Sequence, residues 1–152
     1  MSDPLKLENF LCFSIYSAGH AFNQFYRPLL DEIGLTYPQY LVMVSLWSRD
    51  DQTVKKIGQA LSLESNTLTP LLKRLEALQL ISRTRDPKDE RQVRIRLTQQ
   101  GKSLKRQAER IPVCIADALG LPADELKELH DKMLLVQQRL QRSADKRWSP
   151  GT

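Results

Sequence analysis

Two cysteines, Cys12 and Cys114, are the most reactive side chains in this sequence of 152 residues. A thiol reacts with a peroxide as the thiolate and gives a sulfenic acid, which a second thiol converts into a disulfide. Two cysteines are too few for a disulfide framework, and they lack the Cys-x-x-Cys spacing of a zinc site. His20 and His130 have no partner at metal-ligand spacing, so we expect no metal and no cofactor. Cysteine is often buried as inert core, so the thiols alone leave redox chemistry and plain packing both open.

A second group of chemically active side chains is basic and lies between Arg83 and Arg96. Six Lys or Arg residues occur there against three Asp or Glu residues. From 92 to 97 polar residues alternate with apolar ones, which predicts a strand with one basic and one apolar face. We expect the arginines to point outward, where phosphate is a natural partner, since Arg offers a planar fork of donors and phosphate neutralisation releases counterions. A charged hairpin is also common as a solvated turn, so this signal depends on the elements around it.

The residues before this basic segment are patterned as two short helices. Apolar residues spaced by three and four predict helices over 54–61 and from about 66 to 79, separated by a polar turn at 62–64. The second helix begins among three residues of capping type, Ser65, Asn66 and Thr67. If Thr67 is the cap, Pro70 lies in the first turn, whereas an earlier start implies a kink.

Two strand-like segments follow, 81–85 and 93–97, on either side of a charged turn at 86–91. A two-stranded ribbon is marginal alone, so its apolar side must lie on the helices. Helix, short turn, helix and basic hairpin in this order predict a winged helix-turn-helix over 52–98. We expect the second helix in the major groove of DNA and Arg91, oriented by Asp89, in the minor groove. The side chains predicted to contact DNA are Ser65, Asn66, Thr67, Thr69, Lys73, Arg74, Arg83, Arg85, Asp89, Arg91 and Arg94.

Long helices are predicted on both sides of this head, within 5–48 and 99–142. Thr98 is a predicted N-cap, and Pro112 should bend or loosen the helix that contains it. The apolar stripes are wider than one contact needs, and a compact head does not need them for its own core. We therefore expect a homodimer, because two-fold proteins read the two half-sites of a pseudo-palindromic operator. The prediction is a single domain over 1–152, mainly α with a small β-wing, and a flexible tail at 143–152.

The composition limits which classes of partner and which cellular compartment we expect. The apolar and charged contents, 41% and 27%, are ordinary for a globular protein, and the net charge of +5 favours an acidic partner. No apolar run approaches the roughly 18 residues of a membrane span, and the amino terminus has no signal-peptide pattern. Together with the low cysteine count, this predicts a cytoplasmic protein without a membrane partner.

Several stretches resemble the MarR family of dimeric winged-helix transcription regulators over roughly 5–142. They are Leu68–Glu76, Leu80–Ile81 with Arg83, Asp86–Arg91, and Leu97–Thr98 with Gly101. Cys12, Tyr26 and Tyr37 resemble the branch that senses organic hydroperoxides, OhrR, and Cys114 resembles its two-cysteine subtype.

The resemblance implies a sensing mechanism. An organic hydroperoxide would oxidise Cys12, whose thiolate the hydroxyls of Tyr26 and Tyr37 would stabilise, with Tyr16 as a weaker candidate. Cys114 of the other subunit would then form a disulfide, and the regulator, a repressor, would release its operator. An apolar pocket would favour organic hydroperoxides, and four residues are candidates for its lining: Phe10, Phe13, Phe22 and Leu41.

Three alternatives stay open at this point. The first is a MarR-type repressor that responds to a small aromatic ligand, with structural cysteines. The second is a thiol peroxidase, although the sequence places no Arg or Thr near Cys12 as such sites usually have. The third is an interaction module that does not bind DNA.

Overall fold

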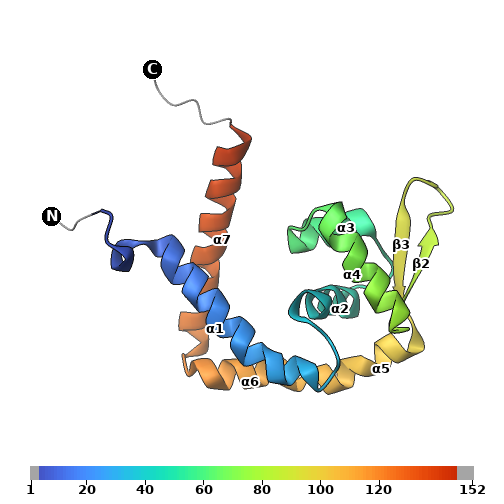
Figure 1. Ribbon diagram of the computed structural model, residues 1–152, viewed down its shortest axis with the longest axis horizontal. Coiled ribbons are helices and arrows are strands. Elements are labelled where there is room, and N and C mark those ends of the chain that lie inside the picture. Colours follow the sequence, from blue (N-terminus) through green and yellow to red (C-terminus); the bar gives the residue numbers. More distant parts are fainter. Residues whose placement is uncertain (1–3, 147–152) are drawn as a thin grey trace. The chain divides into compact units, whose positions relative to one another are not determined.

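The computed structural model describes residues 4–146, which are mainly helical with a small antiparallel sheet (Figure 1). The elements are η1 Leu7–Asn9, α1 Leu11–Asp31, α2 Tyr37–Ser48, β1 Gln52–Thr53, α3 Val54–Leu61, α4 Ser65–Ala77, β2 Ile81–Arg85, β3 Val93–Leu97, α5 Gln99–Ala108, α6 Arg110–Leu119 and α7 Ala123–Asp145. The chain divides into two compact units, and the boundary between them in the sequence lies between Ile111 and Pro112. None of the helices in the described part of the chain is both long and apolar enough to cross a membrane.

The amino-terminal residues form a short 3-10 turn and then the long helix α1. Cys12 lies in the first turn of α1. The next helix, α2, begins as predicted with Pro38 in its first turn, and Thr36 and Gln39 form a reciprocal capping box around it. These caps set where the chain leaves α1 and enters the head.

The helix pair of the head follows the predicted pattern, with one difference. Helix α3 spans the predicted residues, and Thr53 caps it by accepting a hydrogen bond from the Lys56 N–H at 3.2 Å. Helix α4 begins at Ser65, so the earlier of the two starts left open by the sequence is adopted, and its N-cap is Glu64 without a side-chain cap bond. Pro70 therefore lies inside α4, where it has no N–H to donate to the preceding turn.

The sheet has three strands, so the prediction of a two-stranded ribbon is wrong in this respect. Strand β1 pairs with β3, and the strand order is β1-β3-β2. Two residues of β1 carried no periodic signal of their own, because a strand that short contains a single alternation. β3 is consequently the central strand, and its Ile95 is fully buried.

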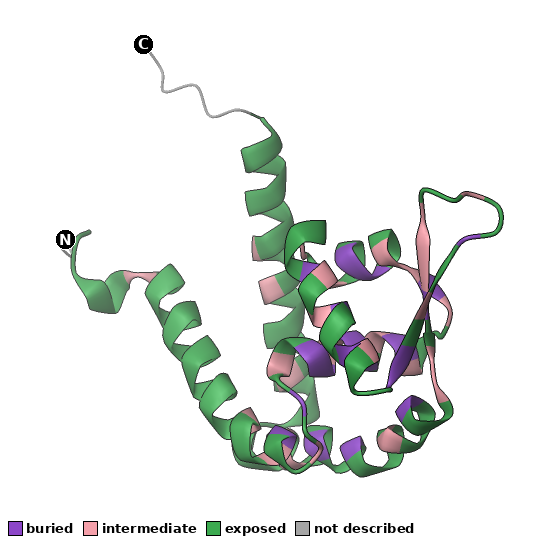
Figure 2. Ribbon diagram, turned by 45° about the vertical axis from the view of Figure 1, so that its right-hand side comes forward, coloured by how far each residue is buried: buried purple, intermediate pink, exposed green. Residues whose placement is uncertain are grey.

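The core lies in the head, as Figure 2 shows by the purple segments of α2, α3, α4 and the sheet. The leucine stripe predicted for α4 supplies much of this core. Fully buried side chains include Val42, Met43, Leu46, Ile57, Leu68, Leu72, Leu75, Ile81, Ile95 and Ile111.

The predicted break near Pro112 is present, since α5 ends at Ala108 and α6 begins at Arg110. Pro112 has no N–H for the carbonyl of Ala108, which accounts for the interruption. In the second unit α7, which is described in full, contains no buried residue. The predicted flexible tail is helical as far as Asp145, and 147–152 lie outside the described residues.

Candidate nucleic-acid interface and thiol site

Helix α4 buries its leucines and exposes a polar face. Ser65, Asn66 and Thr67 are exposed at its amino end, and Lys73 and Arg74 are exposed further along. These residues belong to the predicted DNA-contacting set, and the fold leaves their side chains accessible. Short hydroxyl and amide groups at a helix N-terminus suit contacts to phosphates and base edges.

Thr69, on the same helix, is half-buried, and its hydroxyl donates to the Ser65 carbonyl at 2.8 Å. This back-bond occupies the only hydrogen of the hydroxyl and leaves its lone pairs as acceptors.

The tip of the β2–β3 hairpin, called the wing below and spanning 86–92, presents Arg91 to solvent. The Arg91 side chain is 94% exposed, and its Nε lies 3.5 Å from Oδ1 of Asp89. The same carboxylate accepts the Arg91 backbone N–H at 3.1 Å. Asp89 therefore orients Arg91 as the sequence predicts. Arg85 is also exposed and donates to the carbonyl of Glu90 at 3.3 Å.

Arg94 does not point outward with the other arginines. Its Nε donates to Oδ1 of Asp51 at 2.7 Å, and one terminal nitrogen donates to Oδ2 of Asp86 at 3.1 Å. The other terminal nitrogen donates to the Asp51 carbonyl at 2.8 Å. Hydrogen bonds from Arg94 and then Arg96 lower the pKa of Asp51. The N–H of Lys88 and then Arg94 lower the pKa of Asp86.

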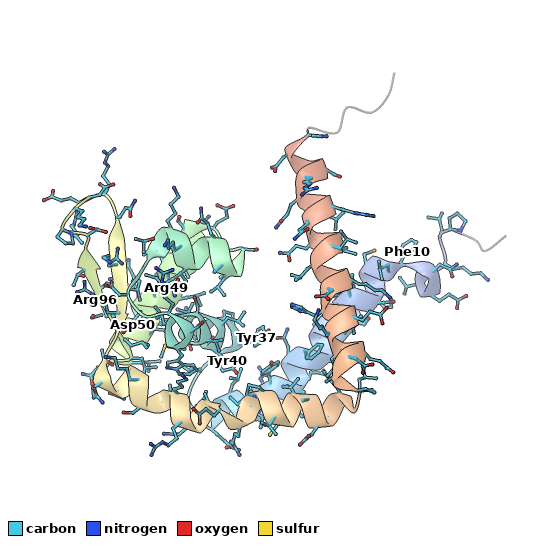
Figure 3. All side chains as sticks on the ribbon, turned by 180° about the vertical axis from the view of Figure 1, so that it is seen from behind. Phe10, Tyr37, Tyr40, Arg49, Asp50 and Arg96 are labelled. Carbon is cyan, nitrogen blue, oxygen red and sulfur yellow. The ribbon has the colours of Figure 1, made fainter. Side chains whose placement is uncertain are left out.

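Arg83 is likewise paired inside the head. Its Nε donates to Oε1 of Glu76 at 3.2 Å, and its backbone N–H donates to Oε2 at 3.1 Å, which joins β2 to α4. Arg96 pairs with Asp51 at 3.1 Å and remains half exposed. Figure 3 shows Arg96 near Asp50, whose carboxylate accepts the Leu97 N–H at 2.8 Å.

Sequence reasoning missed the acidic partners of these arginines. Asp51 precedes Arg94 by 43 residues, so no local pattern links them. Asp86 was visible only as part of a charged turn, and its burial to 8% exposure was not foreseen. The carboxylates of Asp51 and Asp86 both bind the Arg94 guanidinium, and these bonds hold the base of the wing against the corner between α2 and β1.

The tyrosines expected to support a thiolate lie together, where α1 meets α2. The rings of Tyr26 and Tyr37 are 4.8 Å apart between centroids, and those of Tyr26 and Tyr40 are 6.0 Å apart. Burial, with smaller effects of Tyr37 and Tyr40, raises the pKa of Tyr26 to about 12. The Tyr26 hydroxyl is therefore protonated at neutral pH and can donate a hydrogen bond.

Cys12 is exposed and lies far from these tyrosines of its own chain. Tyr26 follows it by 14 residues of continuous helix, which corresponds to roughly 21 Å at the rise of an α-helix. Figure 3 likewise shows Phe10, two residues before Cys12, at the far end of α1 from Tyr37. One chain by itself therefore does not assemble the predicted thiol site.

The remaining residues expected near Cys12 are also dispersed. Phe13 lies beside Cys12, whereas Phe22 is further along α1 and Leu41 lies on α2. The Tyr16 hydroxyl lies 3.1 Å from Nε2 of His20, so its contact is with that ring. Cys114 is half-buried on α6. Among residues 4–146, no three His, Cys, Asp or Glu side chains gather in a way that could hold a metal ion.

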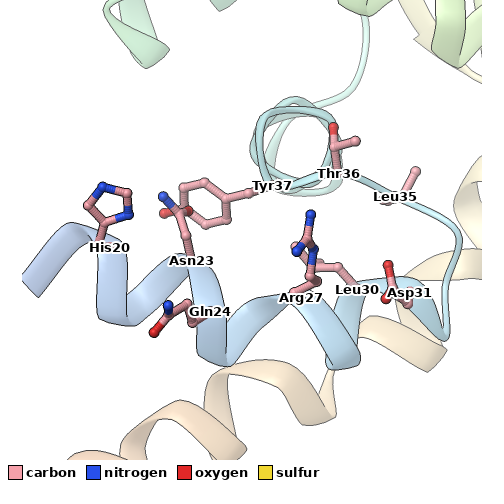
Figure 4. A pocket seen from close by; sticks show the side chains of 9 residues that line it. All are labelled: His20, Asn23, Gln24, Arg27, Leu30, Asp31, Leu35, Thr36 and Tyr37. Carbon is pink, nitrogen blue, oxygen red and sulfur yellow. The ribbon is translucent and has the colours of Figure 1, made fainter.

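An open pocket of about 820 Å³ lies between α1 and the start of α2 (Figure 4). Arg27 and Tyr37 reach into it, and several amide and hydroxyl side chains complete it. Its lining comprises His20, Asn23, Gln24, Arg27, Leu30, Asp31, Leu35, Thr36 and Tyr37.

Comparison with known families identifies this architecture. A family model described as "Transcriptional regulator SarA/Rot" matches residues 24–108, which cover α2, the winged head and α5. The chain belongs to the SarA/Rot and MarR-type winged-helix transcription regulators. This family consists of regulators, so the membership confirms the resemblance stated above and the prediction that the protein is not an enzyme.

Two named transcriptional regulators are similar to this MarR-type chain over most of its length. The HTH-type transcriptional regulator TtmR of Methylorubrum extorquens is 46% identical over 91% of this chain and 71% of its own. The organic hydroperoxide resistance transcriptional regulator of Bacillus subtilis is 44% identical over 91% of this chain and 94% of its own.

A solved relative is AbfR of Staphylococcus epidermidis, whose reduced form has been solved bound to DNA. That structure is 41% identical in sequence, covers 88% of this MarR-type chain and 93% of its own, and has a TM-score of 0.75. AbfR has also been solved overoxidized and bound to DNA, and with a disulfide formed.

Proposed function

We propose that this protein is a cytoplasmic, dimeric repressor that binds a pseudo-palindromic operator and releases it when an organic hydroperoxide oxidises Cys12. The observation that carries the proposal is the presence of both an exposed thiol and a half-buried tyrosine cluster in a winged-helix regulator. The Bacillus subtilis relative, named for organic hydroperoxide resistance, and the DNA-bound AbfR structure support it.

DNA binding follows from the exposed polar face of α4 and from the wing. Helix α4 enters the major groove, and Ser65, Asn66 and Lys73 are accessible for contacts there. Arg91 at the wing tip reaches the minor groove. Arg83 and Arg94 already have carboxylate partners, so their part is to hold the wing in position rather than to neutralise phosphate.

Dimerisation is supported by the apolar side chains that one chain leaves uncovered. Among the 21 described residues of α1, only Leu30 is buried. Leu11, Ile15 and Phe22 on α1 are exposed by 39–58%, and Leu140 on α7 by 66%. A face of this kind is stable in water when a second copy covers it.

The thiol site then combines two copies. Since α1 holds Cys12 roughly 21 Å from Tyr26 of its own chain, the tyrosines that serve the thiol belong to the other subunit. Their hydroxyls donate to the sulfur and stabilise the thiolate without adding a charge. The start of a helix also favours negative charge at this position.

The reaction proceeds in two balanced steps. The Cys12 thiolate attacks the terminal oxygen of the hydroperoxide, an S–O bond forms and the O–O bond breaks, which converts the thiolate into a sulfenic acid. The alkoxide that leaves takes a proton from water and becomes the alcohol. The Cys114 thiol of the other subunit attacks that sulfur, an S–S bond forms, and the hydroxyl leaves as water. The new bond alters the spacing of the two heads, so both half-sites can no longer be engaged together.

AbfR supports a decisive role for the cross-link. Its overoxidized form was solved bound to DNA, and a disulfide form was solved separately. Overoxidation therefore does not prevent DNA binding in that relative. For this chain we infer that the intersubunit disulfide, rather than oxidation of Cys12 by itself, causes release.

A non-reducing gel combined with a duplex-binding assay tests the proposal. One equivalent of cumene hydroperoxide should convert the parent protein into a covalent dimer that no longer binds operator DNA. Cys12→Ser and Cys114→Ser should both stay monomeric on the gel and keep the DNA bound. DNA release by the Cys12→Ser variant under peroxide would refute the sensing role.

A second candidate function is supported by the pocket beside Tyr37. Arg27 supplies a positive charge and Tyr37 an aromatic face, which suits a small aromatic carboxylate. In that case benzoate-type acids would release DNA from the Cys12→Ser variant without any oxidant. Absence of release by such acids would leave the thiol as the trigger.

A further inference from the structure

The tyrosine cluster is one end of a row of aromatic side chains that continues along α2. Tyr40 lies 6.0 Å from Tyr26, and Trp47 lies 6.4 Å from Tyr40, between ring centroids. Tyr40 and Trp47 are seven residues apart, so two turns of α2 place them on one face. Tyr40 is 5% exposed, which makes the middle of the row part of the packed interior.

The far end of the row is tied to α5. Trp47 donates its indole N–H to the carbonyl of Gly101 at 2.9 Å, across 54 residues of sequence. Indole nitrogen is a donor only, and this bond satisfies it in a half-buried place. A movement of α2 that shifts Trp47 therefore acts directly on the first turn of α5.

The first turn of α5 in turn contacts the short connection between α4 and β2. A Cβ atom on Gly101 would lie 2.0 Å from the carbonyl oxygen of Leu80, so only glycine fits there. The Thr98 N–H donates to the carbonyl of Leu80 at 3.1 Å, and the Thr98 hydroxyl donates to the carbonyl of Gln79 at 2.6 Å. Gln79 and Leu80 join α4 to β2, and Gln79 has a left-handed backbone with φ of 60°.

We propose that Trp47 is a positioning residue that couples the tyrosine cluster to the joint between α4 and β2. The inference rests on the proposed function, because it assigns the route by which oxidation at the thiol site reaches the DNA-binding elements. Packed side chains shift between discrete arrangements rather than deform gradually, so a displaced Tyr26 or Tyr37 moves Tyr40 and Trp47 with it. The Gly101 turn follows and shifts α4 and the wing, and it is through this shift that the disulfide changes the spacing of the two recognition elements on the operator.

Trp47→Phe tests the coupling, because it keeps an aromatic ring in the row and removes the N–H that reaches Gly101 together with the five-membered ring that carries it. Thr53→Ala is the matched control, since it also removes one hydrogen bond between a side chain and the backbone, at the cap of α3 and off the row. Both variants are compared with the parent for duplex affinity, reduced and after cumene hydroperoxide, and for covalent dimer on a non-reducing gel. Thermal unfolding shows that each variant is folded.

The reduced Trp47→Phe variant should bind duplex within about twofold of the parent and form the covalent dimer normally. Oxidation should weaken the duplex affinity of the parent and of Thr53→Ala by about thirtyfold, and that of Trp47→Phe by less than about threefold. Equal losses in Trp47→Phe and the parent would overturn the coupling role and leave the sensing function intact. A parent that forms no covalent dimer, or keeps its DNA, would overturn the sensing function and the coupling with it.

Tryptophan emission gives an independent measurement. In a Trp148→Phe background Trp47 is the sole indole of the sequence, and its emission reports its own surroundings. Cumene hydroperoxide should shift that emission, and Cys12→Ser should abolish the shift. An emission that stays unchanged while the covalent dimer forms would show that Trp47 does not move with the sensor, and the proposal would fail.

Discussion

Tyr26 is the single residue whose chemistry is most constrained by its surroundings. Burial against Tyr37 and Tyr40 raises its pKa to about 12, so the hydroxyl stays a neutral donor across the physiological range. A neutral donor stabilises a thiolate and leaves the charge of the sulfur available for attack on a peroxide. Tyr16 differs from Tyr26 in its surroundings, because its hydroxyl contacts His20 on an exposed part of α1.

Tyr26→Phe should slow oxidation of Cys12 by cumene hydroperoxide by about tenfold, the size expected for losing one hydrogen bond to a charged group. Stopped-flow loss of the free thiol measures the rate. Tyr16→Phe is the matched control and should react at the parent rate. The same slowing in both variants would mean that Tyr26 has no particular place in the thiol site.

The raised pKa of Tyr26 also predicts how stability depends on alkaline pH. The folded state holds the proton up to about pH 12, whereas an unfolded chain releases it near the ordinary value of 10.0. The stabilisation from this tyrosine is therefore complete below pH 10 and is lost as the pH rises toward 12. Thermal melts of the parent and of Tyr26→Phe from pH 8 to 11 should converge at the alkaline end. Parallel melts across the range would contradict the prediction.

Among the elements, the wing owes its position to a charge cluster at its base. Arg94 binds Asp51 from the corner before β1 and Asp86 from the start of the wing, with all contacts between 2.7 and 3.1 Å. Arg91 at the tip is almost fully exposed. Two arginines three residues apart thus differ, since Arg94 is paired within the fold, whereas Arg91 is exposed and is the one that we propose contacts DNA.

Arg94→Ala should lower the urea midpoint of unfolding, because it removes the main hydrogen-bond partner of Asp51 and the second donor to Asp86. Arg91→Ala should change stability by less than about 0.5 kcal/mol and weaken duplex binding by about tenfold. Urea titrations and fluorescence anisotropy at fixed salt measure the two effects. A loss of stability in Arg91→Ala, or none in Arg94→Ala, would reverse this assignment.

At the scale of the whole molecule, the main feature is the apolar stripe of α1, which a single chain leaves exposed to solvent. Phe22 is 39% exposed, and Leu11 and Ile15 are on the same side of the helix. The separation of Cys12 from Tyr26 along α1 agrees with the proposed function, in which a sensing site forms only when two chains meet. In that proposal, dimerisation and sensing depend on one surface.

Phe22→Asp should shift the protein from dimer to monomer in sedimentation velocity and should weaken duplex binding by at least about tenfold, because a monomer engages one half-site. Ser17→Asp introduces the same charge on another side of α1 and should leave both properties near the parent values. A dimeric Phe22→Asp variant would place the interface elsewhere.

Much of the fold was predictable because the signals are local. Spacings of three and four residues predicted α3 and α4, Thr98 and Pro38 marked helix starts, and Pro112 marked a break. The start of α4 was predicted at about 66, one residue late, because three capping-type residues in a row compete and the chain uses Glu64 as the cap.

The sequence by itself determined the winged helix-turn-helix, the family and the residues available for redox chemistry, since periodicity, caps and short motifs act over a few residues. Only the tertiary structure decided that β1 joins the sheet, that Arg83 and Arg94 turn inward and that Cys12 lies apart from Tyr26. Each of these depends on groups brought together, or held apart, across tens of residues. Such distances are set by how helices pack and how long they run, and no local pattern records them.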